Sequence, residues 1–122
     1  MCGGQIQKSG HHTLIDAADC DRAAVTNPAL IAEFVRELVK AIDMVAYGEP
    51  QVIHFGEDNK AGYTLVQLIE TSNIMAHFCD DSGDCYFDVF SCKTYDLQTV
   101  VDLFEKYFHP KRVRVNYMTR QA

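Results

Sequence analysis

The sequence has few basic residues and no basic run of the kind that follows a nucleic-acid backbone. Its 122 residues include 11 Lys and Arg against 17 Asp and Glu, which gives a net charge of −6. Binding to phosphates requires clustered Lys and Arg, so this composition argues against a nucleic-acid-binding protein. The one basic cluster, Lys111, Arg112 and Arg114, falls in a predicted final strand, where a solvated or edge position explains it better.

The sequence also lacks a recognisable membrane span and secretion signal. No stretch approaches the roughly 20 apolar residues that cross a bilayer, and the start M-C-G-G has no charged region followed by an apolar one. The five cysteines, at positions 2, 20, 79, 85 and 92, are odd in number and form no C-x-x-C pair. We therefore expect a cytoplasmic protein whose thiols are free.

A metal site is not favoured by the spacing of the residues that could bind one. The residues of suitable type are His11, His12, His54, His77, Cys79 and Cys85. Their spacing matches no zinc-binding template, and the pair of cysteines alone is a weak signal. We expect no metal cofactor.

What the sequence does contain is a pattern of strands and helices typical of one domain spanning residues 1–122. Its composition is 48% hydrophobic, which suffices for a proper core. Apolar alternation and β-branched residues predict strands over residues 11–17, 51–55, 63–70, 72–79, 85–92 and 112–118.

Two amphipathic helices complete the pattern. Asn27 is suited to cap the first helix and Pro28 to its first position. Gly48 is predicted to end a run of apolar residues at three-to-four spacing, which comprises Leu30, Ile31, Phe34, Val35, Leu38, Val39, Ile42 and Val45. The second helix is predicted over residues 97–108, capped by Thr94 or Asp96 and closed by Pro110. The predicted fold is α+β, a two-layer α/β sandwich with an antiparallel-rich sheet and two helices in the order β-α-β-β-β-β-α-β.

We place the chemistry in residues 69–92, with Ser72 at the centre. A histidine, His77, follows this serine by five positions, and a cysteine, Cys92, follows it by twenty. Strand alternation puts Ser72 and His77 on opposite faces of one strand. A bulge, a bend or a chain break near Ser72 would be needed to bring the two side chains to one face.

These spacings resemble those of the short, bacterial-type S-adenosylmethionine decarboxylase proenzymes. That family has a Glu-Ser cleavage pair, a histidine five residues after the serine, an acidic residue four further on, and a cysteine twenty after the serine. The corresponding residues here are Ser72, His77, Asp81 and Cys92, and residues 89–92 read V-F-S-C.

The resemblance extends over nearly the whole chain. Thr64, which follows Gly62 at a short distance as in the family, matches a second hydroxyl residue eight positions before the serine. The segment G-H-H-T-L-I-D at residues 10–16 is similar to the family's first strand. The similar region therefore covers about residues 10–118.

Four departures from the family pattern bear on the substrate more than on the fold. The residue before the serine is Thr71, with the glutamate one place earlier at Glu70. Asn73 stands where histidine is usual, and Asp81 is one methylene shorter than the usual glutamate. The loop after Phe55 is also longer than in the family.

The resemblance implies a chain that cuts itself. The Ser72 hydroxyl would attack the carbonyl of Thr71, the resulting ester would undergo elimination, and the new amino terminus would become a pyruvoyl group. That group forms a Schiff base with the substrate amine and accepts the electrons left when carbon dioxide departs, as other decarboxylase cofactors do. If Thr71 were the nucleophile instead, the same spacings would fall on Ala76 and Ser91, so Ser72 is preferred.

The resemblance also implies roles for the remaining site residues. His77 would remove the serine α-proton, and Thr64 would donate a hydrogen bond to the oxyanion of the acyl shift. Cys92 would return a proton to the substrate α-carbon. Asp81 would accept hydrogen bonds from ribose hydroxyls, although turn chemistry explains an aspartate there equally well.

On the substrate side, Phe55 resembles the aromatic residue that stacks on adenine or meets the sulfonium, a contact worth roughly 0.5–2 kcal/mol. Glu70 is assigned to substrate binding with it.

We therefore expect a decarboxylase of S-adenosylmethionine that supplies the aminopropyl donor for spermidine synthesis. The resemblance implies a homodimer with the site at the interface, and neither nucleic acid nor membrane is an expected partner. Two alternatives stay open. One is a related pyruvoyl decarboxylase of another amino acid such as ornithine or arginine. The other is an unprocessed, non-catalytic homologue.

Overall fold

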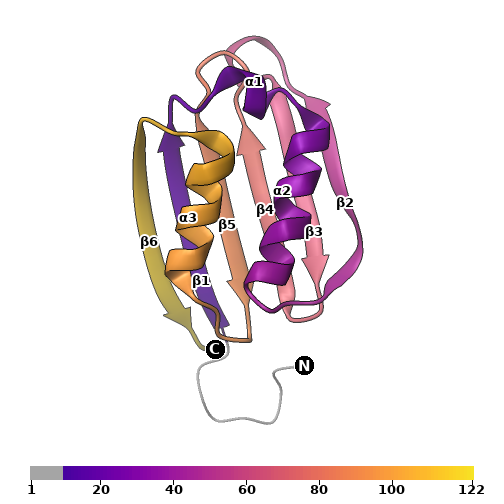
Figure 1. Ribbon diagram of the computed structural model, residues 1–122, viewed down its shortest axis with the longest axis vertical. Coiled ribbons are helices and arrows are strands. Elements are labelled where there is room, and N and C mark those ends of the chain that lie inside the picture. The colour runs from indigo at the N-terminus through magenta and orange to yellow at the C-terminus, as the bar shows by residue number, and fades with distance from the viewer. Residues whose placement is uncertain (1–9) are drawn as a thin grey trace.

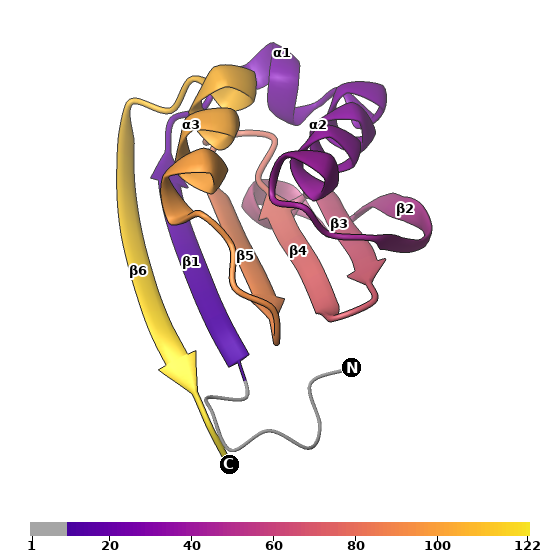
Figure 2. The same cartoon turned by 60° about the horizontal axis from the view of Figure 1, so that its bottom comes forward.

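The computed structural model describes residues 10–122 of the chain. The elements in chain order are β1 (Gly10–Ala18), α1 (Arg22–Val25), α2 (Pro28–Ala41), β2 (Ala46–Phe55), the 3₁₀ turn η1 (Asp58–Lys60), β3 (Gly62–Ile69), β4 (Ser72–Phe78), β5 (Cys85–Ser91), α3 (Leu97–Phe108) and β6 (Arg112–Arg120). The six strands form one sheet in the order β2-β3-β4-β5-β1-β6, and every neighbouring pair is antiparallel. Both long helices, α2 and α3, lie on the same face of this sheet (Figures 1 and 2). The predicted α+β sandwich and element order are confirmed, with the short helix α1 as an addition.

The first strand of the chain lies inside the sheet rather than at its edge. Ile15 of β1 is opposite Phe87 of β5 on one side and opposite Val115 of β6 on the other. Figure 1 shows the indigo β1 between the orange β5 and the yellow β6. The two halves of the sequence are therefore interleaved in one sheet.

The core lies between the sheet and the two long helices and is rich in aromatic rings. Phe34 of α2 is fully buried at its centre. Its ring centroid is 5.6 Å from that of Phe87 on the sheet, and 6.0 Å and 5.0 Å from those of Phe104 and Phe108 on α3. Edge-to-face packing of this kind adds about 0.5–1.5 kcal/mol per pair beyond the burial of apolar area. This packing holds the strands that carry the candidate site residues in a fixed register.

The first long helix ends earlier than its apolar pattern predicts. The prediction that it runs to Gly48 is wrong, because α2 stops at Ala41 and Asp43 adopts a left-handed φ of 59°. The Met44 amide then bonds the Val39 carbonyl at 2.8 Å, which is the hydrogen bond of a Schellman cap. Such a cap normally has glycine in the left-handed position, so the aspartate gave no sequence signal for the helix end. The next strand, β2, begins at Ala46, five residues before its predicted start.

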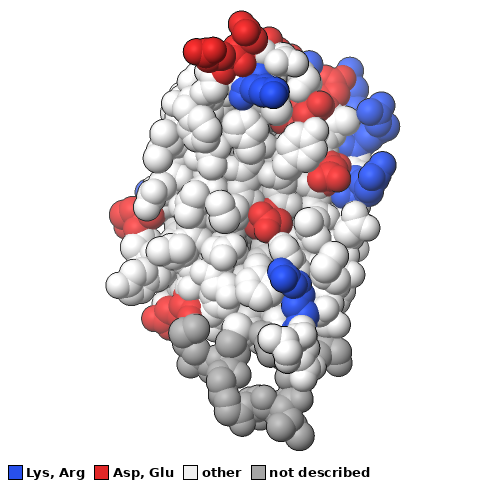
Figure 3. All heavy atoms as spheres, turned by 180° about the vertical axis from the view of Figure 1, so that it is seen from behind, with Lys and Arg blue, Asp and Glu red and all other residues white. Residues whose placement is uncertain are grey.

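The sheet face opposite the helices exposes large apolar side chains. Ile53, Phe55, Leu68, Met75, Tyr86 and Met118 are each between 38% and 55% exposed. Cross-strand register aligns Ile53, Thr64, His77 and Tyr86 in one row across β2, β3, β4 and β5. Figure 3 shows this side of the molecule, where charged side chains are sparse across the middle. Contiguous exposed apolar surface of this kind marks interaction sites. Among the helices of residues 10–122, none has the length and apolar character of a transmembrane span.

Candidate active site

A strained residue marks the turn between β3 and β4. The last cross-strand pair is Ile69 with Ser72, so Glu70 and Thr71 form a two-residue loop. Such loops usually need positive φ at the loop residues and therefore favour glycine or asparagine. Ser72 has φ 155°, whereas neither loop residue is among the described residues with positive φ. The unfavourable backbone conformation of this tight turn therefore lies at Ser72, and it costs about 1–3 kcal/mol of conformational strain.

The carbonyl of Thr71, directly before this serine, is polarised by a backbone donor. The amide of Cys92 donates a hydrogen bond to the Thr71 oxygen at 3.0 Å. Ser72 is in register with Ser91 of β5, which places Cys92 beside the turn. The structure therefore brings together Thr71, Ser72 and Cys92, three of the residues predicted for the cleavage and catalytic site.

Two hydroxyl groups in this turn differ in their surroundings. The Thr71 hydroxyl lies 2.7 Å from the buried Ser91 hydroxyl and 3.4 Å from the sulfur of Met44. Among residues 10–122, the Ser72 hydroxyl has no hydrogen-bond partner. The threonine hydroxyl is thus held, while the serine hydroxyl is uncommitted, which favours Ser72 over Thr71 as the attacking group.

A second group of predicted residues lies further along the hairpin. Thr64 and His77 are cross-strand partners, and the Thr64 hydroxyl lies 2.9 Å from His77 Nδ1. His77 Nε2 lies 3.3 Å from the Lys60 carbonyl, which can only accept, so that nitrogen donates. A neutral ring then accepts a hydrogen bond from Thr64 at Nδ1. The Phe55 ring centroid is 6.1 Å from that of His77, so the predicted aromatic contact residue joins this group.

His77 borders two surface recesses on this side of the sheet. One, of about 480 Å³, is also lined by Lys60, Cys79, Asp81 and Tyr86, among others. The other, of about 730 Å³, lies between Phe55 and the loop that contains η1. Asp81 is exposed, and its backbone carbonyl accepts a hydrogen bond from Arg22 Nε at 3.0 Å. This bond tethers the backbone of Asp81, and the residue lines a recess that also reaches His77.

The two groups are far apart within one chain. Ser72 and His77 begin and nearly end the same strand, and five residues of strand span about 16 Å at roughly 3.3 Å each. The irregular backbone at Ser72 does not change this, because the pairs Ile69–Ser72 and Thr64–His77 are at opposite ends of the β3–β4 ladder. No direct proton transfer between the two side chains is possible in a single protomer.

The cysteines only partly follow the prediction of free thiols. Cys20, Cys79 and Cys85 are free, as predicted, while Cys2 lies outside the described residues. For Cys92 the prediction is wrong, since the structure records it as disulfide-bonded, and a proton-donor role requires the reduced thiol. Burial raises the pKa of Cys20 to about 12 and raises that of Cys85 as well, so both stay protonated at neutral pH.

Metal ligands are not assembled in the described part of the chain. Across residues 10–122, no three His, Cys, Asp or Glu side chains are grouped so that they could hold a metal ion.

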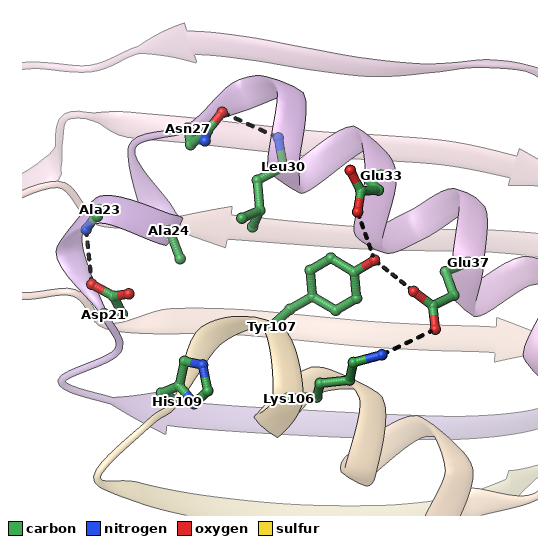
Figure 4. Close-up of a pocket in the computed structure, with 10 residues that line it drawn as sticks. All are labelled: Asp21, Ala23, Ala24, Asn27, Leu30, Glu33, Glu37, Lys106, Tyr107 and His109. Carbon is green, nitrogen blue, oxygen red and sulfur yellow. Dashed lines mark hydrogen bonds and ion pairs between the residues drawn. The ribbon is translucent and has the colours of Figure 1, made fainter.

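A separate groove on the helix side contains none of the predicted residues. It lies between α1, α2 and α3 and is shown in Figure 4. Tyr107 donates a hydrogen bond to Glu37 at 2.6 Å, and Lys106 lies 3.7 Å from the same carboxylate. The bond to Glu37 raises the pKa of the Tyr107 phenol. The polar groups drawn at the groove's centre pair with one another, so they stabilise the contact between α2 and α3.

The architecture is that of a known class of decarboxylase. The fold is similar to the crystal structure of the adenosylmethionine decarboxylase from Aquifex aeolicus VF5, with a TM-score of 0.79 over 95% of this chain and 93% of that chain. Sequence identity is 23%, so this likeness concerns the fold.

Sequence comparison identifies the family. The profile of the S-adenosylmethionine decarboxylase family matches residues 11–121, and the chain belongs to that family. A relative from Pyrococcus furiosus, described as S-adenosylmethionine decarboxylase proenzyme, is 27% identical over 91% of this chain and 78% of its own length. A protein of the same description from Clostridium botulinum strain Langeland is 24% identical over 94% of this chain and 97% of its own.

Proposed function

We propose that this chain is a self-cleaving, pyruvoyl-dependent decarboxylase of S-adenosylmethionine. Family membership supports the reaction class, and the relatives described as proenzymes support self-processing. The observation that carries the proposal is the 3.0 Å hydrogen bond from the Cys92 amide to the Thr71 carbonyl, next to a strained serine with an uncommitted hydroxyl.

The first step of cleavage exchanges an amide for an ester. A bond forms between Ser72 Oγ and the carbonyl carbon of Thr71, the bond from that carbon to the Ser72 nitrogen breaks, and the hydroxyl proton goes to the departing amine. Negative charge develops on the Thr71 oxygen during attack, where the Cys92 amide stabilises it. Release of the strain at Ser72 adds to the driving force.

The second step breaks the ester by removal of the Ser72 α-proton. His77 is assigned as the base, since a neutral imidazole can accept a proton near pH 7. Its hydrogen bond with the Thr64 hydroxyl orients the ring. Elimination releases the carboxylate of Thr71, and hydrolysis of the new amino terminus gives the pyruvoyl group with loss of ammonia.

Residues at this terminus fit a pyruvoyl group. The group supplies an electron sink for decarboxylation, and it would stand at the first residue of β4, paired on both sides by β3 and β5. Cys92, adjacent to it, is assigned to protonate the substrate α-carbon once its disulfide has been reduced. Phe55 is assigned to the adenine or sulfonium and Asp81 to the ribose hydroxyls, both beside His77, and Glu70 of the turn completes the proposed substrate-binding set.

The separation of the two residue groups is best explained by a homodimer. One group contains Ser72 and Cys92, and the other contains Thr64 and His77. A two-fold axis near Met75, midway between Ser72 and His77 on β4, would bring the first group of one protomer to the second group of its partner. Met75 is 38% exposed on the apolar face that no helix covers within the described residues, and this face is the proposed dimer interface.

Intact-mass spectrometry after reduction of disulfides tests the cleavage. Wild-type protein is expected to yield two fragments, residues 1–71 and 72–122, the second beginning with a carbonyl-containing residue. Ser72→Ala should remain whole, while Thr71→Ser, which keeps a hydroxyl at the preceding position, should still cleave. A single intact mass for wild-type protein would contradict the proposal.

Release of labelled carbon dioxide tests the substrate. S-adenosylmethionine is expected to be turned over, while ornithine and arginine serve as the competing substrates. The product would supply the aminopropyl group for spermidine synthesis in the cytoplasm, where Cys92 would be reduced. Turnover of ornithine or arginine alone would keep the pyruvoyl chemistry and overturn the proposed substrate.

A further inference from the structure

We propose that the hydroxyl pair Thr71–Ser91 positions the scissile peptide for the acyl shift, an inference that rests on the proposed self-cleavage. Thr71 stands where the family pattern has glutamate, so its hydroxyl belongs to this chain rather than to the shared pattern. Ser91 is fully buried at the end of β5. The two hydroxyl oxygens lie 2.7 Å apart.

Thr71 is attached at two points to two consecutive residues. Its side-chain oxygen contacts Ser91 Oγ, and its carbonyl oxygen accepts from the amide of Cys92 at 3.0 Å. Two bonds from one residue to neighbouring positions of a paired strand fix the plane of the Thr71–Ser72 peptide. A single bond would leave the peptide free to rotate about it.

The hydroxyl pair is itself anchored by groups that satisfy it. The Lys93 amide donates to Ser91 Oγ at 3.0 Å. The Met44 sulfur, 3.4 Å from the Thr71 hydroxyl and 3.7 Å from that of Ser91, is an acceptor for the remaining hydroxyl proton. Both hydroxyl protons therefore have an acceptor, one within the pair and one at the sulfur, so the pair is satisfied and held in place.

This geometry matters for the rate because the oxyanion donor is a backbone amide with no freedom to follow a shifted carbonyl. The acyl shift forms the bond from Ser72 Oγ to the Thr71 carbon, breaks the bond from that carbon to the Ser72 nitrogen and moves the hydroxyl proton to that nitrogen. Loss of one oxyanion donor typically slows such reactions about 100- to 1000-fold. If the Thr71 carbonyl occupies the correct position only part of the time, cleavage should be slowed by part of that factor, about 10- to 100-fold.

The test is the rate of self-cleavage of Thr71→Val, which keeps the shape of the side chain and removes its hydroxyl. Protein is made by cell-free translation under reducing conditions, and the intact chain is followed by mass spectrometry over time. Thr71→Val is expected to cleave about 10- to 100-fold more slowly than wild type, and the hydroxyl-retaining Thr71→Ser should restore the rate to within a few-fold. Cleavage of Thr71→Val at the wild-type rate would overturn the proposal.

A second readout shows which step of the cleavage is slowed. Hydroxylamine cleaves esters but not amides, so it reports whether the acyl shift has occurred. Uncleaved Thr71→Val should resist hydroxylamine, because it is arrested before the ester, whereas uncleaved His77→Ala should be cut, because it is arrested after it. Hydroxylamine-sensitive Thr71→Val would place the defect after the acyl shift and refute the role given to the pair.

Ser91→Ala provides an independent variant from the other side of the pair. It should show the same slow, hydroxylamine-resistant phenotype with a melting temperature close to that of wild type. Wild-type cleavage rates in both Thr71→Val and Ser91→Ala would remove the inference while leaving the proposed function intact. Absence of cleavage in the wild-type chain would instead remove the proposed function itself.

Discussion

A mixture of two inactive variants should regain activity if each site is shared between protomers. Ser72→Ala removes the proposed nucleophile, and His77→Ala removes the proposed base. Within one chain these residues are separated by five strand positions, about 16 Å. Neither variant should cleave or decarboxylate by itself.

The expected recovery follows from two-fold symmetry. In a heterodimer of the two variants, one site combines both defects, and the other combines an intact Ser72 with an intact His77 from the partner. Random assortment makes half of the dimers mixed, and each mixed dimer has one good site of two, so about a quarter of wild-type activity should return.

The assay is co-expression of the two variants with different affinity tags, followed by measurement of carbon dioxide release. Isolation of the doubly tagged species should raise the recovery to about half of wild type. Co-expression of Ser72→Ala with Cys92→Ala is the matched control, because both residues belong to one group and the mixed dimer then has no complete site. Recovery in the control, or none in the test pair, would refute the division of the site between protomers.

Two further outcomes are expected. Met75→Glu should convert the dimer into a monomer and abolish activity because it buries a charge in the proposed interface. The uncharged Met75→Gln should keep more of the dimer, as measured by light scattering, and more of the activity. A fully active dimeric Met75→Glu would contradict the interface. For Cys20, burial raises the pKa from an ordinary 9.0 to about 12, so between those values the unfolded state loses the proton and the folded state keeps it. The stability contributed below pH 9 is therefore lost as the pH rises, by at most about 1.4 kcal/mol per pH unit for one thiol. Thermal melts from pH 8 to 11 should decline less steeply for Cys20→Ala, and an identical slope would exclude this cause.

The fold was predictable where one physical signal dominated. Alternation along β3, β4 and β5 and the apolar spacing of α3 gave these elements to within a residue or two, since each buries one continuous face. The end of α2 was not predictable, because Asp43 adopts the left-handed conformation that glycine usually provides. The helix α1 was missed because four residues are too few to show a period.

Spacing in the sequence could nominate candidate site residues but not their layout. It singled out Ser72, His77 and Cys92 as candidates, yet a spacing of five residues is a distance only once the backbone conformation is known. In a helix those five positions would rise only about 7.5 Å along the axis, whereas in a strand they span about 16 Å. The bond from the Cys92 amide to Thr71 could not be inferred from residue types at all, since every residue except proline has that donor.

The position of β1 between β5 and β6 has a consequence for what happens after a cut between Thr71 and Ser72. The first fragment would contain β1, β2 and β3, and the second would contain β4, β5 and β6. The two products would thus remain hydrogen-bonded to each other along three separate strand pairs, β3 with β4, β5 with β1 and β1 with β6. Severing the covalent chain would leave the two pieces inseparable without unfolding, and the freshly made end would stay where it was formed.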